Sequence, residues 1–202
     1  MRPPPDYSVL ADGEEAQNQV PVALSGRSIH DYDANRSLVA ETNHVCIESN
    51  TTKQFVRTYT SDLGCFEDGS CSSVSTFNEV RKESLLAKVW YDVHKTYTEL
   101  ELADGRRVMF GRAHLDEIAY ADGGSNRWEQ LYSIEMWLEE TEGTTLHYYA
   151  FWSAVHLPAL GDGLYAAQVE SGLDEGNLNA DNFLSGNADC GNDRDFEYDR
   201  EE

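Results

Sequence analysis

Two short pairs of side chains in this sequence carry the residue types that bind metal ions. Asp31 and Asp33 stand on alternate positions, and alternate residues point to the same face of a β-strand. His114 and Asp116 form a second pair with the same spacing. Calcium requires about six to eight oxygen ligands, and neither pair has a further ligand at a recognisable spacing. We therefore favour a solvated turn for the first pair and keep both pairs as metal candidates.

Asp193 and Asp195 lie in an acidic C-terminal segment whose composition resembles that of calcium-binding loops. Oxygen-bearing side chains recur at alternate positions in residues 174–181 and 189–197. The order of an EF-hand loop, with glycine at the sixth position and glutamate at the twelfth, is absent. A solvated acidic tail is therefore the favoured interpretation, and we expect no cofactor, with calcium as the alternative.

Catalytic motifs are absent from the sequence. It contains no Gly-x-Ser-x-Gly nucleophile motif, no phosphate-binding glycine loop and no dinucleotide fingerprint. Glu135, Glu139 and Glu140 could supply the carboxylate pair of a glycosidase, although any acidic chain offers such pairs. We expect that the protein is not an enzyme, and a hydrolase using these glutamates, or His114 with Asp116, is the alternative.

The charge of the chain excludes two classes of partner. Its 202 residues include 37 acidic and 15 basic side chains, which gives a net charge of −22 at pH 7. Binding to nucleic acid or to an anionic membrane depends on lysine and arginine that neutralise phosphate groups, so neither partner is expected. No apolar run approaches the roughly 18–20 residues that cross a membrane. The expected partners are therefore other protein chains.

The cysteines and the N-terminus indicate the cellular compartment in which the protein is made and its destination. Cys65 and Cys71 flank a turn-like loop that a disulfide could close, but free thiols in a reducing cell are the favoured interpretation. The first residues contain one arginine and three prolines and lack the apolar core of a signal peptide. We expect synthesis in the cytoplasm without a signal peptide, and a virion or an extracellular assembly as the destination.

Two segments give the clearest strand signals. Asp104-Gly105 separates two β-prone runs and fits a type I′ hairpin turn. Residues 128–138 carry apolar side chains at even positions and mostly serine and glutamate at odd positions, which predicts a strand with one apolar and one acidic face. A helix beginning at Asn126 is the alternative for this segment.

Weaker signals surround these two segments. Residues 145–155 are apolar on both faces, which is typical of a central strand. A short helix or turn is expected near 77–83 because Thr76 and Glu79 have capping-box spacing, and a strand follows it. Further strands are expected at 20–25, with Pro21 marking an edge, and at 37–40, 44–48, 54–60 and 163–169.

Together these elements predict a mainly β fold, an antiparallel sandwich or small barrel, in a core domain of residues 20–170. An extended N-terminal arm of residues 1–19 and an extended, acidic Gly/Asn/Asp-rich C-terminal arm of residues 171–202 would flank it. Such segments bury too little apolar surface to offset an ordering cost of about 1–2 kcal/mol per residue. We expect neighbouring chains to hold the arms through Pro3, Pro4, Pro5, Tyr7, Leu173, Leu178, Phe183, Leu184, Phe196 and Tyr198.

These features favour a structural or interaction protein of a large assembly. The leading hypothesis is a virion component, such as a capsid-decorating, connector or tail protein, that forms a homo-oligomer through its arms. The alternatives are a calcium- or carbohydrate-binding β-module from a halophilic or marine organism and the hydrolase described above.

Overall fold

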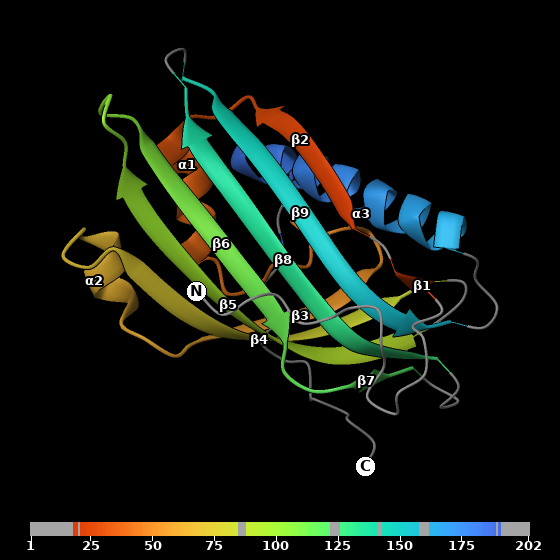
Figure 1. Ribbon diagram of the computed structural model, residues 1–202. Helices are drawn as coiled ribbons and strands as arrows, with labels where there is room; N and C mark the ends of the chain where they lie inside the picture. Colours follow the sequence, from red (N-terminus) through yellow and green to blue (C-terminus); the bar gives the residue numbers. More distant parts are fainter. Residues whose placement is uncertain are drawn as a thin grey trace.

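The computed structural model of this protein describes residues 18–19, 21–84, 88–121, 126–140, 143–157, 162–188 and 190. Within these residues the chain forms one nine-stranded antiparallel sheet, three α-helices and one 3-10 helix (Figure 1). No described helix is both long enough and apolar enough to cross a membrane. The elements are β1 (Asn18–Gln19), β2 (Val22–Ser28), α1 (Tyr32–Ser37), η1 (Leu38–Ala40), β3 (Thr52–Tyr59), α2 (Leu63–Glu67), β4 (Ser73–Glu83), β5 (Lys88–Glu101), β6 (Arg107–Leu115), β7 (Ala119–Tyr120), β8 (Arg127–Glu139), β9 (Thr145–His156) and α3 (Asp162–Leu184).

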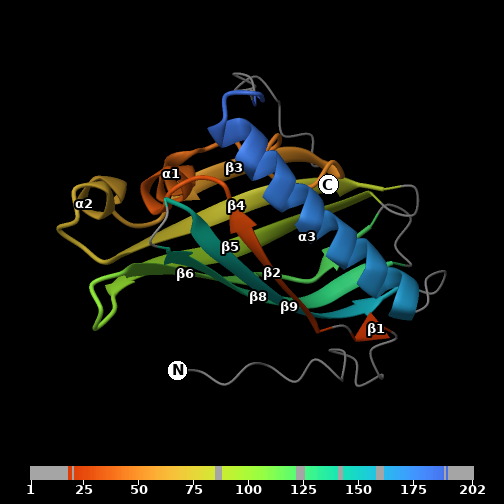
Figure 2. The same cartoon turned by 90° about the horizontal axis from the view of Figure 1, so that it is seen from above.

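The sheet is open and strongly curved. Its strand order is β1-β9-β8-β6-β5-β4-β3, with β2 beside β9 and β7 beside β8. β2 and β3 lie at opposite edges and are joined along the chain through α1 and η1. The long helix α3 runs across the concave side of the sheet (Figure 2). The prediction of a mainly antiparallel β fold is confirmed, but the sandwich or small barrel is wrong, because one open sheet and a helix enclose the core.

The β5–β6 hairpin confirms the turn expected at Asp104-Gly105, although the turn type differs. The amide of Gly105 donates to the carbonyl of Leu102 at 2.9 Å, and the amide of Leu102 donates to the carbonyl of Arg106 at 2.8 Å. Gly105 has φ +84°, while no described non-glycine residue has a positive φ. A type I′ turn requires positive φ at both central residues. The loop is therefore a three-residue connection that ends at a left-handed glycine.

Three other segments differ from their predicted conformation. Residues 73–83 form β4, because Val74, Thr76, Asn78 and Val80 are buried and alternate with half-exposed or exposed side chains, a period that overrides the capping-box spacing. Residues 38–40 form η1 rather than a strand, and the amide of Glu48 donates to the carbonyl of His44 in a helical turn. Strands were correctly predicted at 54–60, as β3, and at 128–138, as β8.

Helix α3 replaces two predicted segments, the strand at 163–169 and the first part of the C-terminal arm. Its C-terminal end is a Schellman motif, in which the amides of Gly186 and Asn187 donate to the carbonyls of Phe183 and Asn182, both at 2.9 Å. The extended course expected for residues 171–184 is therefore wrong. Of the candidate partner-binding residues, Leu173, Phe183 and Leu184 are half-buried and Leu178 is exposed, whereas Pro3, Pro4, Pro5, Tyr7, Phe196 and Tyr198 lie outside the described residues.

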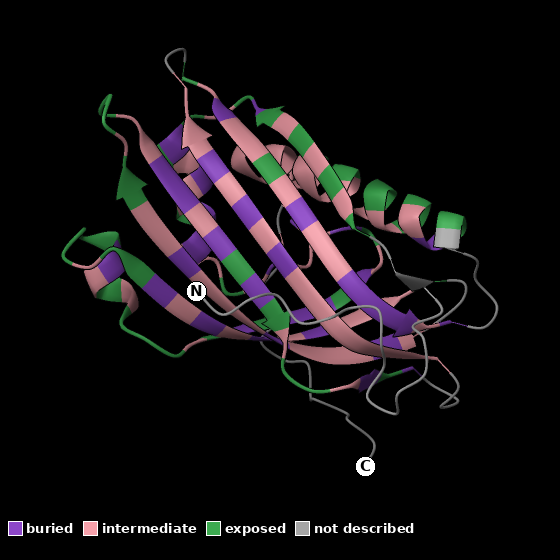
Figure 3. Cartoon of the chain, viewed as in Figure 1, coloured by how far each residue is buried: buried purple, intermediate pink, exposed green. Residues whose placement is uncertain are grey.

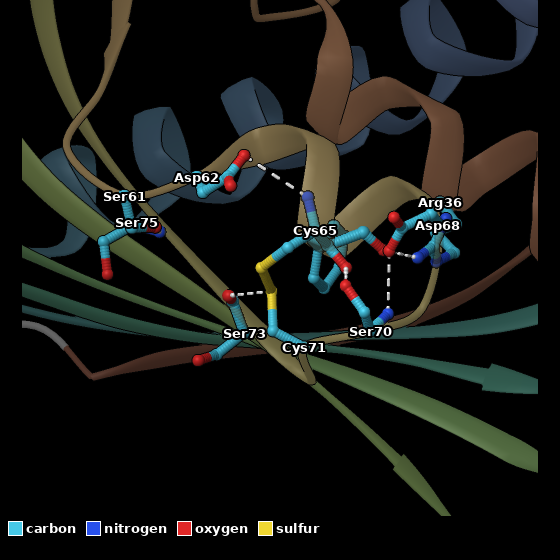
Figure 4. Close-up of a disulfide and its surroundings, with 10 residues drawn as sticks. Arg36, Ser61, Asp62, Cys65, Asp68, Ser70, Cys71, Ser73 and Ser75 are labelled. Carbon is cyan, nitrogen blue, oxygen red and sulfur yellow. Dashed lines mark hydrogen bonds between the residues drawn. A yellow bond between two sulfur atoms is a disulfide. The ribbon is translucent and has the colours of Figure 1, made fainter.

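All four cysteines form disulfides, in contrast to the favoured expectation of free thiols. Cys65 pairs with Cys71 across the end of α2, where the Asp62 side chain accepts from the Cys65 amide at 3.3 Å (Figure 4). Cys46 pairs with Cys190, which lies 144 residues further along the chain. The second bridge joins the loop before β3 to the segment after α3.

Candidate functional site

A cavity of about 910 Å³ lies between the concave face of the sheet and α3. Side chains of β3, β4, β5, β6, β8 and β9 line it from one side, and α3 and residues 44–49 line it from the other. Pockets that hold small organic molecules in proteins span roughly 300–1,000 Å³. The cavity is therefore large enough for a molecule of that size.

The two-residue period of the strands decides which side chains reach the cavity. On β5 the inward positions are odd and include Val93, Lys95 and Tyr97. The same alternation places Tyr149 of β9 and Trp137 of β8 inside. Buried residues alternate with less buried ones along these strands (Figure 3).

The inward face of β8 is the face that its sequence pattern marks as acidic. Ser133, Glu135 and Trp137 are buried and line the cavity. The even positions from Tyr132 to Leu138 are only half-buried and belong to the convex face. A polar strand face can point inward here because the interior contains a cavity with other polar groups rather than a filled apolar core.

The central polar feature of the cavity is an ion pair between β5 and β8. The ammonium group of Lys95 lies 2.6 Å from Oε1 of Glu135, and their side chains are only 14% and 10% exposed. The ammonium group also lies 4.9 Å from the ring centroid of Tyr97 and 5.8 Å from that of Trp137. Burial alone lowers the pKa of Lys95, but the Glu135 carboxylate and Tyr97 outweigh it and raise that pKa above its ordinary value. Lys95 is therefore held as a cation.

Gly111 of β6 makes room for this pair. A Cβ atom at position 111 would lie 3.2 Å from Cε of Lys95 and 3.2 Å from Cζ3 of Trp137. These separations are tighter than ordinary van der Waals contact, so any larger residue would press on both side chains. The absence of a side chain at Gly111 therefore helps to set the position of the ammonium group.

A second polar group lies where β4 meets the loop before β3. The ammonium group of Lys82 lies 3.8 Å from Oε2 of Glu48 and 3.4 Å from Oγ of Ser49. Burial opposes the charge on Lys82, but the neighbouring Tyr91 and Glu48 raise its pKa. In the sheet, Lys82 stands opposite Val89, six residues before Lys95 on β5. At about 3.3 Å per residue, the backbones of the two cationic positions are separated by roughly 20 Å.

Arg57 has a structural role at the far wall of the cavity. Its guanidinium group donates to Oδ1 of Asn78 at 2.9 Å, to the hydroxyl of Tyr97 at 3.1 Å and to Nε2 of His44 at 2.9 Å. Burial and the adjacent Arg57 hold the pKa of His44 well below its usual range. His44 is thus neutral and accepts from Arg57, and the guanidinium is satisfied by the protein itself.

His147 connects the sheet to α3. Its Nδ1 atom donates to Oδ1 of Asn177 at 2.6 Å, and its ring stacks on Trp137 with centroids 4.8 Å apart. Burial lowers the pKa of His147. The neutral imidazole then carries its proton on Nδ1, which leaves Nε2 as a buried acceptor without a partner.

The metal candidates from the sequence do not meet at one place. The Asp31 side chain caps α1 by accepting from the Ala34 amide at 2.8 Å, and Asp33 lies 2.6 Å from Nη1 of Arg107. His114 lies on the exposed side of β6, and Asp116 follows the end of that strand and contacts His94 of β5 at 3.2 Å. Among the described residues, no group of three potential ligands is close enough to hold a metal ion. Asp193 and Asp195 lie outside the described residues.

The glutamates proposed for a hydrolase are also separated. Only Glu135 lines the cavity. Glu139 binds Arg107 at 2.9 Å, and Glu140 binds Arg27 at 2.8 Å. These three carboxylates therefore do not converge on one site.

No known protein-family model matches this chain, and no curated protein matches its sequence. Solved structures do resemble it, at low sequence identity. A STAR-related lipid transfer protein from Xanthomonas axonopodis gives a TM-score of 0.58 at 10% identity, covering 82% of this chain and 85% of its own. A START superfamily protein from Mycobacterium smegmatis gives 0.51 at 11% identity, covering 83% of this chain and 99% of its own.

This chain has the START-type fold. A Zhui aromatase/cyclase from a Streptomyces species also shares it, with a TM-score of 0.51 at 9% identity, covering 84% of this chain and 93% of its own. The predicted role as a virion component, capsid protein or tail protein is therefore wrong. The similar structures are START, lipid-transfer and cyclase proteins, and this chain has a cavity of about 910 Å³ under α3.

Proposed function

We propose that the protein binds a small, largely apolar molecule inside the cavity and carries it in a form shielded from water. The cavity of about 910 Å³ under α3 is the observation that supports this function. Its volume lies in the range of small-molecule pockets, and most of its lining surface is apolar, as in such pockets. The likeness to a STAR-related lipid transfer protein supports the same class of ligand.

Most of the lining would contact the apolar body of such a ligand. The sheet contributes apolar side chains from six strands, and these face α3 across the cavity. Burial of apolar surface contributes roughly 25 cal/mol per Å² to binding before the cost of association is counted. The apolar side chains on the sheet side include Phe55, Val80, Val93, Leu115, Leu131 and Phe151.

The charges of the lining favour an uncharged ligand. Five basic and five acidic side chains line the cavity, although the whole chain carries a net charge of −22. At the central pair, Lys95 offers a donor and Glu135 offers an acceptor side by side. A hydroxyl or amide group can satisfy both, whereas a carboxylate would be repelled by Glu135 and an ammonium by Lys95. We therefore propose a neutral ligand with a hydroxyl or amide group on an apolar body.

The protonation states of Lys95 and His147 in the cavity fit a protein that binds its ligand without converting it chemically. The raised pKa of Lys95 keeps its amine protonated, so it is unavailable as a nucleophile or a base. The lowered pKa of His147 keeps that ring neutral, and its proton is engaged by Asn177. We propose a carrier rather than an enzyme on this basis.

A displacement experiment tests this function. The protein is titrated with Nile red, an uncharged dye that fluoresces in apolar surroundings, and the dye is then competed with compounds of equal chain length. A long-chain alcohol and the matching primary amide are expected to displace the dye at lower concentration than the ionised fatty acid at pH 8. Equal displacement by all three would contradict the role of the ion pair, and absence of dye binding would contradict the function.

A further inference from the structure

Helix α3 forms the cover of the cavity and is held in two different ways along its length. The N-terminal half of α3 packs its apolar residues on the sheet, where Tyr165 and Val169 join a cluster with Val155 and Leu157. The hydroxyl of Tyr165 is also hydrogen-bonded to Oγ of Ser153 at 2.8 Å. This half of α3 is therefore anchored by buried apolar contact.

The C-terminal half of α3 is held mainly by polar contacts. The side chain of Asn179 donates to the carbonyl of Glu48 at 2.7 Å, and the amide of Asn50 donates to Oε2 of Glu175 at 3.1 Å. Asp181 accepts from Ser28 at 2.5 Å. One of these bonds is exposed and two are partly buried. Their groups can bond to water instead when the contact opens, so the net loss is small and they hold the cover weakly.

The inner surface of this half faces the loop before β3 with two glycines, which contribute no apolar side chain to the contact. A Cβ atom added at Gly172 would meet no atom closer than Cβ of Ser49 at 3.6 Å, and one added at Gly176 would first meet the carbonyl of Ile47 at 3.8 Å. Gly172, Gly176, Ile47 and Ser49 all line the cavity. The seam between this half of α3 and the loop is therefore an edge of the cavity that can open without the loss of a large apolar contact.

The Cys46–Cys190 disulfide joins the two sides of this seam. Cys46 belongs to the loop, and Cys190 follows the C-terminal end of α3. The side chain of Asn43 donates to the carbonyl of Cys190 at 3.2 Å, which seats the bridge against the loop. Both cysteines are half-exposed, so a soluble reductant can reach them. While the bridge is intact, α3 is fixed at its far end by the disulfide and at its near end by the chain.

We propose that the Cys46–Cys190 disulfide is a redox latch that controls exchange of the cavity's contents, an inference that rests on the proposed binding function. A dithiol reductant breaks the S–S bond by thiol–disulfide exchange. The two sulfurs of the protein gain two electrons and two protons and become thiols, while the reductant becomes a disulfide. The C-terminal half of α3 is then held by its hydrogen bonds alone and opens along the seam.

The second disulfide provides a matched control. Cys65 and Cys71 close a short loop at the end of α2, and neither residue lines the cavity (Figure 4). The double variant Cys46→Ser/Cys190→Ser removes the latch, and Cys65→Ser/Cys71→Ser removes a disulfide without touching the cover. Reduction of the Cys65→Ser/Cys71→Ser variant with dithiothreitol breaks the Cys46–Cys190 bridge alone, and offers the same comparison if the latch variant folds poorly.

Two measurements test the latch. In amide hydrogen exchange, which requires no ligand, the latch variant is expected to exchange at least about tenfold faster in residues 172–184 than the control variant, with β8 and β9 unchanged. In stopped-flow release of Nile red, the latch variant is expected to release the dye about tenfold faster than the control. Unchanged exchange in residues 172–184 overturns the latch. Faster exchange in a protein that binds no dye supports the movable cover and contradicts the proposed function instead.

Discussion

The ammonium nitrogen of Lys95 lies 2.6 Å from Oε1 of Glu135, and the two residues come from strands that are not neighbours in the sheet. β6 stands between them and carries Gly111 at the point where the two side chains meet. The pair is therefore a property of the folded sheet, since 40 residues separate its members along the chain. It places one donor and one acceptor within an otherwise largely apolar cavity.

Removal of one partner of this pair is expected to destabilise the fold more than removal of both. Lys95→Met or Glu135→Leu leaves one buried charge without its partner, which costs about 3 kcal/mol or more. The double variant Lys95→Met/Glu135→Leu is expected to cost less than either single change, because no unpaired charge remains. Urea denaturation measures the three free energies of unfolding. The exposed pair of Arg106 with Asp104 supplies a control, since Arg106→Gln should shift the midpoint little. Additive losses in the double variant would contradict a coupled pair.

A methyl group at position 111 is expected to disturb the same pair without altering its charges. Gly111→Ala would bring a Cβ atom to 3.2 Å from both Lys95 and Trp137. Such overpacking costs about 1–3 kcal/mol, and the indole ring would shift with the change. The near-ultraviolet circular dichroism of the tryptophans and the urea midpoint report the two effects. Gly143→Ala is the comparison variant, because it is strained by φ +73° but meets no neighbour within 4 Å. An altered tryptophan signal in both variants, or in neither, would show that Gly111 does not position this pair.

The stability of the protein is expected to fall as the pH is lowered below about 6.5. Burial and Arg57 lower the pKa of His44, and burial lowers the pKa of His147. Below the ordinary value near 6.5 the unfolded chain binds protons that the folded chain does not, so acid favours unfolding. For each histidine, every unit by which the pKa in the folded protein lies below that in the unfolded chain lowers the free energy of unfolding in acid by up to about 1.4 kcal/mol. Denaturation at pH 7.5, 6.5, 5.5 and 4.5 measures the slope. His44→Gln can still accept from Arg57 and should flatten it, whereas an unchanged slope would exclude His44 as the source.

The two disulfides are expected to contribute unequally to stability. Their sequence separations are 144 and 6 residues. In the chain-entropy description, closure of the longer loop stabilises the fold by up to about 5 kcal/mol and closure of the shorter by about 2 kcal/mol. Urea unfolding of the two double serine variants gives both values under oxidising conditions. A larger loss for the Cys65–Cys71 variant would show that the short bridge maintains α2 in a way that loop length does not capture.

The sequence was informative where a local pattern dominates the structure. The hairpin around Asp104-Gly105 and the strand at 128–138 were correctly predicted because turn chemistry and a two-residue period are local signals. The sequence pattern did not show which face of the strand at 128–138 points toward the core. Its apolar even positions suggested the core face, yet Glu135 and Trp137 point inward. Trp137, an aromatic residue among acidic and polar ones, was the signal that this face is enclosed.

Helix α3 was missed because its sequence lacks the usual helix signals. It contains glycines at 172 and 176 and many asparagine and aspartate residues, which favour turns in isolation. Tertiary contact outweighs this tendency, since Tyr165 packs in a buried cluster and the Gly186 Schellman motif ends the helix. The Cys46–Cys190 bridge is likewise a product of the tertiary fold, because no local pattern links residues so far apart.

A bulky side chain introduced into the cavity from β6 provides the most direct test of whether this protein is a carrier of apolar molecules. Ala113 is 5% exposed and lines the cavity, while its neighbour Arg112 points to the convex face and is exposed. Ala113→Phe and Arg112→Phe therefore add the same side chain at adjacent positions on opposite faces of one strand. In Nile red titrations, Ala113→Phe is expected to weaken binding at least about tenfold, and Arg112→Phe is expected to bind like the unaltered protein. Equal binding by both variants would contradict an interior binding site.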